Sequence, residues 1–149
     1  MPSAEPTSVI VTGGASGLGA AIAHAVEAAG MTPVVFDMNP SANGFPARVV
    51  DVSDTRSVEA AVDAVAEEHG GLRGVVTAAG IDACGRLDDI DGAAWERVVA
   101  VNLLGTAAVA RAALPHLERS GGRIVTPTRP AVSAASARVK PTTPNLLAQ

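Results

Sequence analysis

The sequence predicts an α/β fold in which helices cover both faces of a doubly wound parallel sheet of about five strands. Three observations support this prediction. Short runs of β-branched residues alternate with longer runs of helix-forming residues, as in a parallel sheet. Apolar residues make up 48% of the 149 residues, and most are aliphatic, which suits strands buried on both faces. Glycine clusters separate several of the runs.

The first half of the chain contains three expected strands. Residues 8–12 are a β-branched run that ends in a glycine cluster, and helix formers follow from Ala20 to Ala29 before Gly30 ends the helix. The compact apolar runs at 33–37 and 47–52 are the second and third strands. A turn-rich segment separates these two runs.

A helix and a fourth strand follow. Ser53 is the expected cap of this helix, because a serine hydroxyl accepts hydrogen bonds from the first free N–H groups. Gly70 and Gly71 end the helix, and the fourth strand is expected at 72–79. The apolar residues at the three-and-four spacing of one buried helix face are Val58, Ala61, Val62, Val65 and Ala66.

The last expected pair is a long helix and a fifth strand. Asp91 is the expected cap of the helix, and residues 123–125 are the strand. The residues expected on one side of the helix are Trp95, Val98, Val99, Asn102 and Leu103. Strands and helices in this alternation predict a Rossmann-type sheet, here incomplete at about five strands.

The chain divides at residue 125 into one domain and a tail. Residues 126–149 hold four of the ten prolines and no Gly, Asp or Glu. This Pro/Ala/Thr-rich composition lacks a sustained helix or strand period, so we expect a disordered tail. Residues 1–125 are the expected domain.

Charge argues against a polyanionic partner. The formal charge is −4, and three of the 11 basic residues lie in the tail, which leaves 8 basic against 15 acidic residues in 1–125. We therefore expect no nucleic-acid partner.

Targeting signals are not evident in the sequence. The N-terminus has no basic flank and no apolar stretch of signal-peptide length, and we count no apolar run near the twenty residues of a membrane span. Cys84 is the only cysteine, so an internal disulfide is excluded. We expect a cytoplasmic protein with no membrane partner and an inert thiol.

The segment from Thr12 to Gly19 lies where the first strand gives way to the first helix. Glycines at this place let the backbone approach a pyrophosphate, and the helix N-terminus offers free N–H groups and a positive dipole end. A side chain at a glycine would block the turn, the diphosphate or the helix–strand contact. An ordinary flexible loop is the alternative. The candidate binding residues are Gly13, Ser16, Gly17, Leu18 and Gly19.

Asp37 ends the second strand, 18 residues after Gly19. A carboxylate there can accept hydrogen bonds from both adenosine ribose hydroxyls, and it would repel a 2′-phosphate. No Arg or Lys lies in the glycine turn or just after Asp37 to neutralise such a phosphate, so NAD is favoured over NADP. The alternative is an Asp that only caps a turn at the strand end.

Four motifs together resemble the short-chain dehydrogenase/reductase family. The resemblance covers residues 8–125, about half of the usual family length, and corresponds to the N-terminal NAD-binding half. The motifs are Thr-Gly-x-x-x-Gly-x-Gly at 12–19, Asp51-Val52, Ala79-Gly80 and Val101-Asn102-Leu103-Leu104-Gly105.

The resemblance implies roles for further residues. Asp51 would bind the adenine amino group, with the Val52 backbone beside the ring. Ala78, Ala79 and Gly80 would line the cofactor ribose, where the family usually has Asn-Asn-Ala-Gly and this chain has Thr-Ala-Ala-Gly at 77–80. Asn102 resembles the helix Asn that holds a water through its backbone and connects the catalytic Lys to solvent. The alternative is a buried Asn that satisfies helix backbone where the helix bends.

The family's catalytic residues have no clear counterparts here. In the family a Tyr transfers the hydroxyl proton, a Lys four residues later lowers the Tyr pKa, and a Ser orients the carbonyl. This chain has no Tyr, its only Lys is Lys140, and Arg129 stands at the expected Ser position. We regard Thr128, Ser133 and Ser136 as solvated tail residues.

We therefore expect a chain that is truncated or frame-shifted after residue 125 and inactive alone. A shifted reading frame could encode Ser and Tyr at the family spacing but not the Lys, so one shift does not explain the whole tail. The exposed 95–103 helix and the open edge of the fifth strand would favour self-association and marginal stability.

Two functions from different classes follow. The first is an oxidoreductase that transfers hydride between NAD and a secondary alcohol or ketone. The second is a non-catalytic NAD-binding module or pseudoenzyme fragment. A methyltransferase fits the glycine spacing less well.

His24, His69 and His116 lie on different expected helices without partners at ligand spacing, so we expect no metal site.

Overall fold

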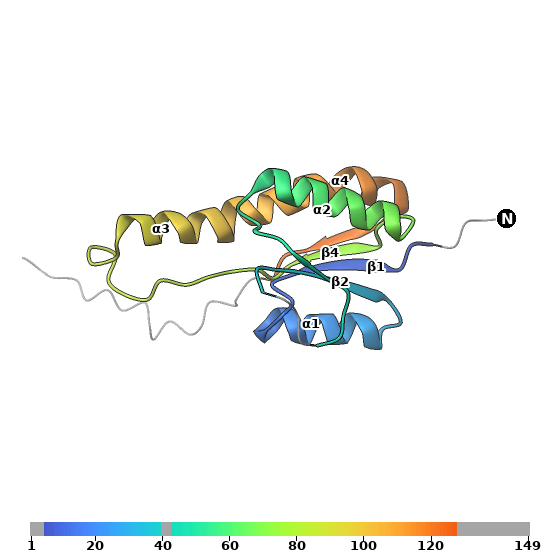
Figure 1. Cartoon of the computed structure of the whole chain (residues 1–149), viewed down its shortest axis with the longest axis horizontal. Coiled ribbons are helices and arrows are strands. Elements are labelled where there is room, and N and C mark those ends of the chain that lie inside the picture. The colour runs from blue at the N-terminus through green and yellow to red at the C-terminus, as the bar shows by residue number, and fades with distance from the viewer. Residues whose placement is uncertain (1–4, 40–42, 128–149) are drawn as a thin grey trace, which may run out of the picture.

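A computed structural model describes residues 5–39 and 43–127. In this part of the chain, five parallel strands form one sheet in the order β3-β2-β1-β4-β5 (Figure 1). The strand order reverses at β1, which is the switch point of a doubly wound fold. The strands are β1 Ser8–Thr12, β2 Thr32–Asp37, β3 Ala47–Val49, β4 Gly74–Thr77 and β5 Arg123–Val125.

The strands are aliphatic because helices cover both faces of the sheet. All residues of β1 and β4 are buried. Their side chains alternate between two cores, so Ile10 and Val75 belong to the larger core and Val11 and Val76 to the smaller one. In the parallel register, Ile10 lies beside Val34 on one side and beside Val75 on the other. The predicted Rossmann-type sheet is confirmed.

Among the described residues, one helix covers one face of the sheet, and two helices cover the other (Figure 1). Helix α1 (Gly17–Ala28) lies on one face, and α2 (Thr55–Glu68) and α4 (Thr106–Ser120) lie together on the other (Figure 1). Val26 of α1 joins the smaller core, whereas Val62 of α2 and Val109 of α4 join the larger core.

The cap of α2 differs from the prediction. Asp54, not Ser53, is the N-cap, because its carboxylate accepts hydrogen bonds from the N–H groups of Arg56 (3.1 Å) and Ser57 (3.3 Å). The Ser53 hydroxyl instead donates to Asp51 at 2.6 Å. Ser53 and Asp54 are adjacent residues that could each accept these hydrogen bonds, and the Asp54 carboxylate is the one that does. Asp91 caps the next helix as predicted.

One continuous helix runs from Gly92 to Ser120 and consists of α3 (Gly92–Val99), the π-helical segment η1 (Ala100–Gly105) and α4. Figure 1 shows α3 projecting beyond the carboxyl ends of the strands. No residue of α3 is buried, and the side chain of Trp95 is 49% exposed. The buried residues of η1 are Val101 and Gly105. The side predicted to contain Trp95 and Leu103 is therefore turned to solvent.

The length of this helix corrects one statement made from the sequence. The helix at 92–120 is long and apolar enough to cross a membrane by length and composition alone, whereas we counted no such run. Its α4 part packs on the sheet through Ala108, Val109, Ala113 and Leu117. A core helix passes the same test of length and composition.

Two strands are shorter than predicted. β3 ends at Val49 rather than Val52, although the Val50 N–H still donates to the Asp37 carbonyl at 3.0 Å. β4 covers Gly74–Thr77 rather than 72–79, and its last residue, Thr77, pairs with Thr12, where β1 also ends. Beyond β5, the Thr126 hydroxyl accepts a hydrogen bond from Thr77 at 3.0 Å. The rest of the expected tail, residues 128–149, lies outside the described residues.

Two glycines of the long helix give a matched test of its packing. A Cβ on Gly105 would lie 2.7 Å from a methyl carbon of Val52, whereas a Cβ on Gly92 would meet nothing within 4 Å. We expect Gly105→Ala to lower the free energy of unfolding by about 1–3 kcal/mol because of overpacking. Gly92→Ala should leave it unchanged or raise it by up to about 1 kcal/mol. Urea denaturation followed by circular dichroism measures both, and equal effects would contradict the packing at Val52.

Candidate cofactor-binding site

A cavity of about 360 Å³ lies at the carboxyl ends of the strands. All eleven residues that the sequence indicated for cofactor binding line it. They are Gly13, Ser16, Gly17, Leu18, Gly19, Asp37, Asp51, Val52, Ala78, Ala79 and Gly80. Parallel strands end at the same edge of a sheet, so residues distant in sequence meet there.

The glycine turn packs backbone directly against backbone. Gly13 has φ +68° and its N–H donates to the Phe36 carbonyl at 2.7 Å. A Cβ on Gly13 would lie 2.7 Å from the Ala79 Cα, and a Cβ on Gly19 would lie 2.1 Å from the Gly13 carbonyl oxygen. A side chain at Gly13 or Gly19 would separate the turn from α1 or from β4.

Gly17 differs from these two glycines. Its φ is +54°, yet a Cβ there would meet nothing within 4 Å. Gly17 begins α1, and Ser16 before it makes no side-chain cap. Free backbone N–H groups at this helix N-terminus lie beside the cavity, and the first turn of α1 contains no acidic residue. Such a terminus favours an anionic group.

The Asp37 carboxylate lies between the end of β2 and the glycine turn. Its Oδ2 accepts a hydrogen bond from the Ala15 N–H at 3.0 Å, and its Oδ1 accepts one from the Asn39 N–H at 3.0 Å. Asp37 therefore caps the turn at the end of β2, which is the alternative role that the sequence suggested for it. Each carboxylate oxygen has a second acceptor position, so the same side chain can also face a ligand.

The segment after β4 is held from both sides. On one side the buried Thr12 hydroxyl accepts a hydrogen bond from the Ala79 N–H at 3.0 Å. On the other side the Asn102 amide accepts from the Ile81 N–H and donates to the Ile81 carbonyl, each at 2.9 Å. These contacts fix the cavity wall formed by Ala79, Gly80 and Ile81.

Asn102 itself does not line the cavity. It lies in the π-helical segment, and its carbonyl accepts a hydrogen bond from the Thr106 hydroxyl at 2.8 Å. The structure therefore places it behind the wall, where it binds backbone. The residue is exposed and its side chain binds the backbone of Ile81 rather than that of its own helix, so the structure does not show the alternative of a buried Asn that satisfies helix backbone.

Asp51 lies in a small polar cluster after β3. Its Oδ1 accepts hydrogen bonds from the Ser53 hydroxyl (2.6 Å) and the Ser53 N–H (2.9 Å), and its Oδ2 accepts one from Arg97 at 3.0 Å. The pKa of Asp51 is lowered, most strongly by the hydrogen bond from the Ser53 hydroxyl. Burial is the second largest effect and raises it, and the Ser53 N–H and then Arg97 lower it further.

The structure adds cavity residues that the sequence analysis missed. Arg97 is the charged one among them. Val101 faces the core one helical turn later, so Arg97 at four residues' spacing lies on the same helix face. The sequence alone carries no signal for Arg97, because it did not indicate that Val101 is buried. The other added residues are Phe36, Met38, Asn39, Val50, Ile81 and Val101.

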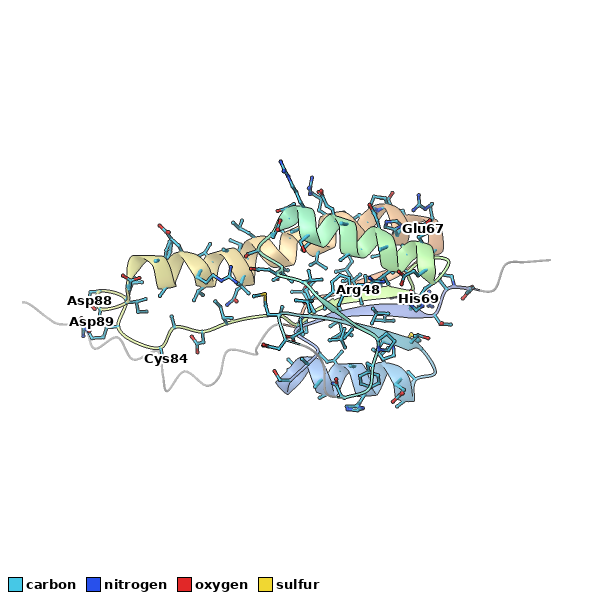
Figure 2. The ribbon with its side chains drawn as sticks, viewed as in Figure 1. Arg48, Glu67, His69, Cys84, Asp88 and Asp89 are labelled. Carbon is cyan, nitrogen blue, oxygen red and sulfur yellow. The ribbon has the colours of Figure 1, made fainter. Side chains whose placement is uncertain are left out.

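Several reactive side chains lie away from the cavity. Figure 2 shows Cys84, Asp88 and Asp89 on the loop before α3, at the end of the molecule distant from the sheet. A hydrogen bond to Asp82 raises the pKa of the exposed Cys84 thiol. Within residues 5–39 and 43–127, no group of three or more His, Cys, Asp or Glu side chains could hold a metal ion.

A family model described as short chain dehydrogenase matches residues 7–138 of the chain. The match extends past Val125, where the resemblance in the sequence analysis ended. Thr128, Arg129, Ser133, Ser136 and Lys140, which were weighed as tail residues, lie outside the described residues.

Similar proteins include three bacterial dehydrogenases. The 2-(S)-hydroxypropyl-CoM dehydrogenase 3 of Xanthobacter autotrophicus is 35% identical over 133 residues, which cover 78% of this chain and 51% of the relative. The D-threitol dehydrogenase of Mycolicibacterium smegmatis is 34% identical, covering 85% and 54%. The cis-4-hydroxycyclohexanecarboxylate dehydrogenase of Sinomonas cyclohexanicum is 36% identical, covering 78% and 52%. The chain spans about half the length of these relatives.

Solved structures show the same fold. The ligand-free aldohexose dehydrogenase of Thermoplasma acidophilum superposes with a TM-score of 0.78 and 28% identity, covering 82% of this chain and 49% of that one. An alcohol dehydrogenase of Thermococcus sibiricus, complexed with 5-hydroxy-NADP, has a TM-score of 0.73 and 27% identity, covering 80% and 57%.

The lowered pKa of Asp51 predicts a pH dependence of stability. An ionised Asp51 stabilises the fold above the ordinary carboxyl pKa of about 3.9, and this contribution is lost as the pH falls through the lower folded value. We expect Asp51→Asn to lower the free energy of unfolding by at most about 1 kcal/mol, because the pair is partly exposed.

The difference between the two proteins should be constant from about pH 8 to pH 5 and shrink below about pH 4. Urea denaturation across this range measures it. A difference that already disappears between neutral pH and about pH 5 would contradict the lowered pKa.

Proposed function

The chain belongs to the short chain dehydrogenase family, and from this premise we propose that it supplies the NAD-binding half of an oxidoreductase. The single observation that carries the proposal is the cavity in which a glycine turn, a free helix N-terminus and two strand-end carboxylates meet. In such a fold, a dinucleotide binds across the switch point of the sheet. The proposed ligand is NAD.

The residues present fit the parts of a dinucleotide. The open space over Gly17 at the N-terminus of α1 suits the diphosphate, because N–H groups there are free and the dipole end is positive. Asp37 would accept hydrogen bonds from the adenosine ribose hydroxyls, and Asp51 from the adenine amino group. Ala78, Ala79 and Gly80 would lie along the second ribose.

Asp37 supports NAD over NADP. A 2′-phosphate beside this carboxylate would place two negative charges together. The cationic side chain that lines the cavity, Arg97, is hydrogen bonded to Asp51 and Ser53 at the end of the neighbouring strand. The Thermococcus sibiricus structure is complexed with an NADP derivative, so this preference requires a direct measurement.

Hydride transfer to or from a secondary alcohol or ketone is the proposed reaction of the complete enzyme, consistent with the names of the three relatives. Bound NAD supplies the carbon that accepts or donates the hydride. In this chain, Thr12 and Asn102 would hold the wall at 79–81 against which the nicotinamide end lies.

These 149 residues contain no Tyr that could transfer the hydroxyl proton. We propose that the chain alone binds NAD without turnover. Asn102 would then be a positioning residue, and proton transfer would need groups that the described residues do not supply. A cytoplasmic location is also part of the proposal.

The cofactor preference is tested by titrating the full chain with NADH and NADPH and following nicotinamide fluorescence. We expect NADH to bind at least about tenfold more tightly, as two hydrogen bonds to a charged acceptor allow. Asp37→Ser should weaken NADH binding and reduce the preference. Asp89→Ser, on the exposed loop before α3, is the matched control and should change neither.

Binding of neither dinucleotide would refute the proposed function, and equal binding of both would refute the preference for NAD. The same samples, mixed with NAD and a panel of secondary alcohols, should produce no reduced nicotinamide. If reduced nicotinamide forms, the chain contains its own proton-transfer group and the proposed lack of turnover is wrong.

We also propose that two copies of the chain associate. The described residues place nothing against the outer edge of β5, and an unpaired strand edge can pair with another chain. Exposed apolar side chains on the long helix add to this surface, with Trp95 49%, Leu103 64% and Leu104 59% exposed.

Sedimentation velocity over a range of concentrations tests association. We expect the mean sedimentation coefficient to rise with concentration, and Leu103→Glu to reduce the rise by burying a charge in the contact. Leu87→Glu, at a 77% exposed position in the preceding loop, is the control. A single monomeric species at all concentrations would contradict the proposal.

A further inference from the structure

We propose that Arg97 determines the selectivity of the cavity for a 6-amino purine over a 6-oxo purine. It would act as a positioning residue that presents one oxygen of Asp51 to the base. The inference rests on the proposed function, since it concerns the adenine end of the same cavity. It goes beyond that function because it names the residue that sets base selectivity.

Arg97, Ser53 and Asp51 form a closed ring of hydrogen bonds. One guanidinium nitrogen of Arg97, Nη1, donates to the Ser53 hydroxyl oxygen at 2.6 Å, and the other, Nη2, donates to Asp51 Oδ2 at 3.0 Å. The Ser53 hydroxyl donates onward to Asp51 Oδ1 at 2.6 Å. Planar guanidinium donors in this arrangement fix the direction of a carboxylate.

The acceptor positions of Asp51 are almost all used. A carboxylate offers about four lone-pair positions. Oδ1 accepts from both the N–H and the hydroxyl of Ser53, and Oδ2 accepts from Arg97. The remaining position is on Oδ2, the oxygen that Arg97 holds. Asp51 lines the cavity, so this lone pair is the one available to a ligand.

The chemistry of this lone pair selects the base. An exocyclic amino group donates a hydrogen bond to the carboxylate, whereas the carbonyl oxygen of a 6-oxo purine would face it with a second acceptor. An acceptor that faces another acceptor in place of a donor weakens binding. Asp51 is held ionised, so it has no proton with which to satisfy the carbonyl.

Arg97 also connects the ring to a helix with little other support. Helix α3 contributes no buried residue, and the first buried residue of the long helix is Val101 in η1. Loss of the Arg97 guanidinium would leave Asp51 held only by Ser53. The carboxylate could then turn its second oxygen away from the ligand.

The test compares NADH with reduced nicotinamide hypoxanthine dinucleotide, in which a carbonyl replaces the 6-amino group. Both are titrated into the full chain by fluorescence. We expect the wild-type chain to bind NADH about tenfold more tightly than the hypoxanthine analogue. Arg97→Gln should bring this ratio close to one, and Arg97→Lys should keep part of it because one hydrogen bond to Asp51 can form.

Arg111→Gln is the matched control, since Arg111 pairs with Glu59 on the outer face of α4 and should leave the ratio unchanged. Because the readout is a ratio of two ligands on one protein, a general loss of stability would not imitate the effect. If Arg97→Gln still binds NADH and its preference for NADH over the hypoxanthine analogue is unchanged or increased, this inference is wrong, whereas the proposed function stands. Failure of the wild-type chain to bind NADH would overturn the proposed function, and this inference with it.

Discussion

The close approach of Gly13 to Gly19 and to Ala79 is the constraint on which the rest of the structure depends. A side chain at Gly19 would overlap the Gly13 carbonyl, so α1 can begin directly above the end of the central strand only because both positions lack a Cβ. The same turn is fixed by hydrogen bonds from Gly13 to Phe36 and from Ala15 to Asp37. One local sequence motif therefore aligns three strand ends at one cavity.

This dependence explains why many of the residues that line the cavity could be anticipated from the sequence. The glycine turn is a local feature. Asp37 is the last residue of β2, and Asp51 follows the end of β3 by two residues. Because the sheet is parallel, any residue placed just after a strand reaches the same edge. All eleven predicted cofactor-binding residues line the cavity for this reason.

The features that could not be predicted depend on contacts between distant segments. Ser53 and Asp54 are equally good caps by residue type. In the structure the Ser53 hydroxyl is hydrogen bonded to Asp51, and Asp54 is the residue that caps α2. Arg97 joins this group from 44 residues later in the chain. Val101 is buried in the π-helical segment, which a regular helical period does not anticipate.

The π-helical segment also sets the angular relation between the two ends of the long helix. A π-helical turn accommodates an additional residue, and one residue corresponds to about 100° of rotation in a regular helix. If the same six residues 100–105 were wound as a regular α-helix, α3 would be rotated by about 100° around the helix axis relative to α4. The π-helical winding of this segment, rather than the identity of a side chain within it, therefore sets whether Arg97 on α3 lies on the side of the long helix that lines the cavity.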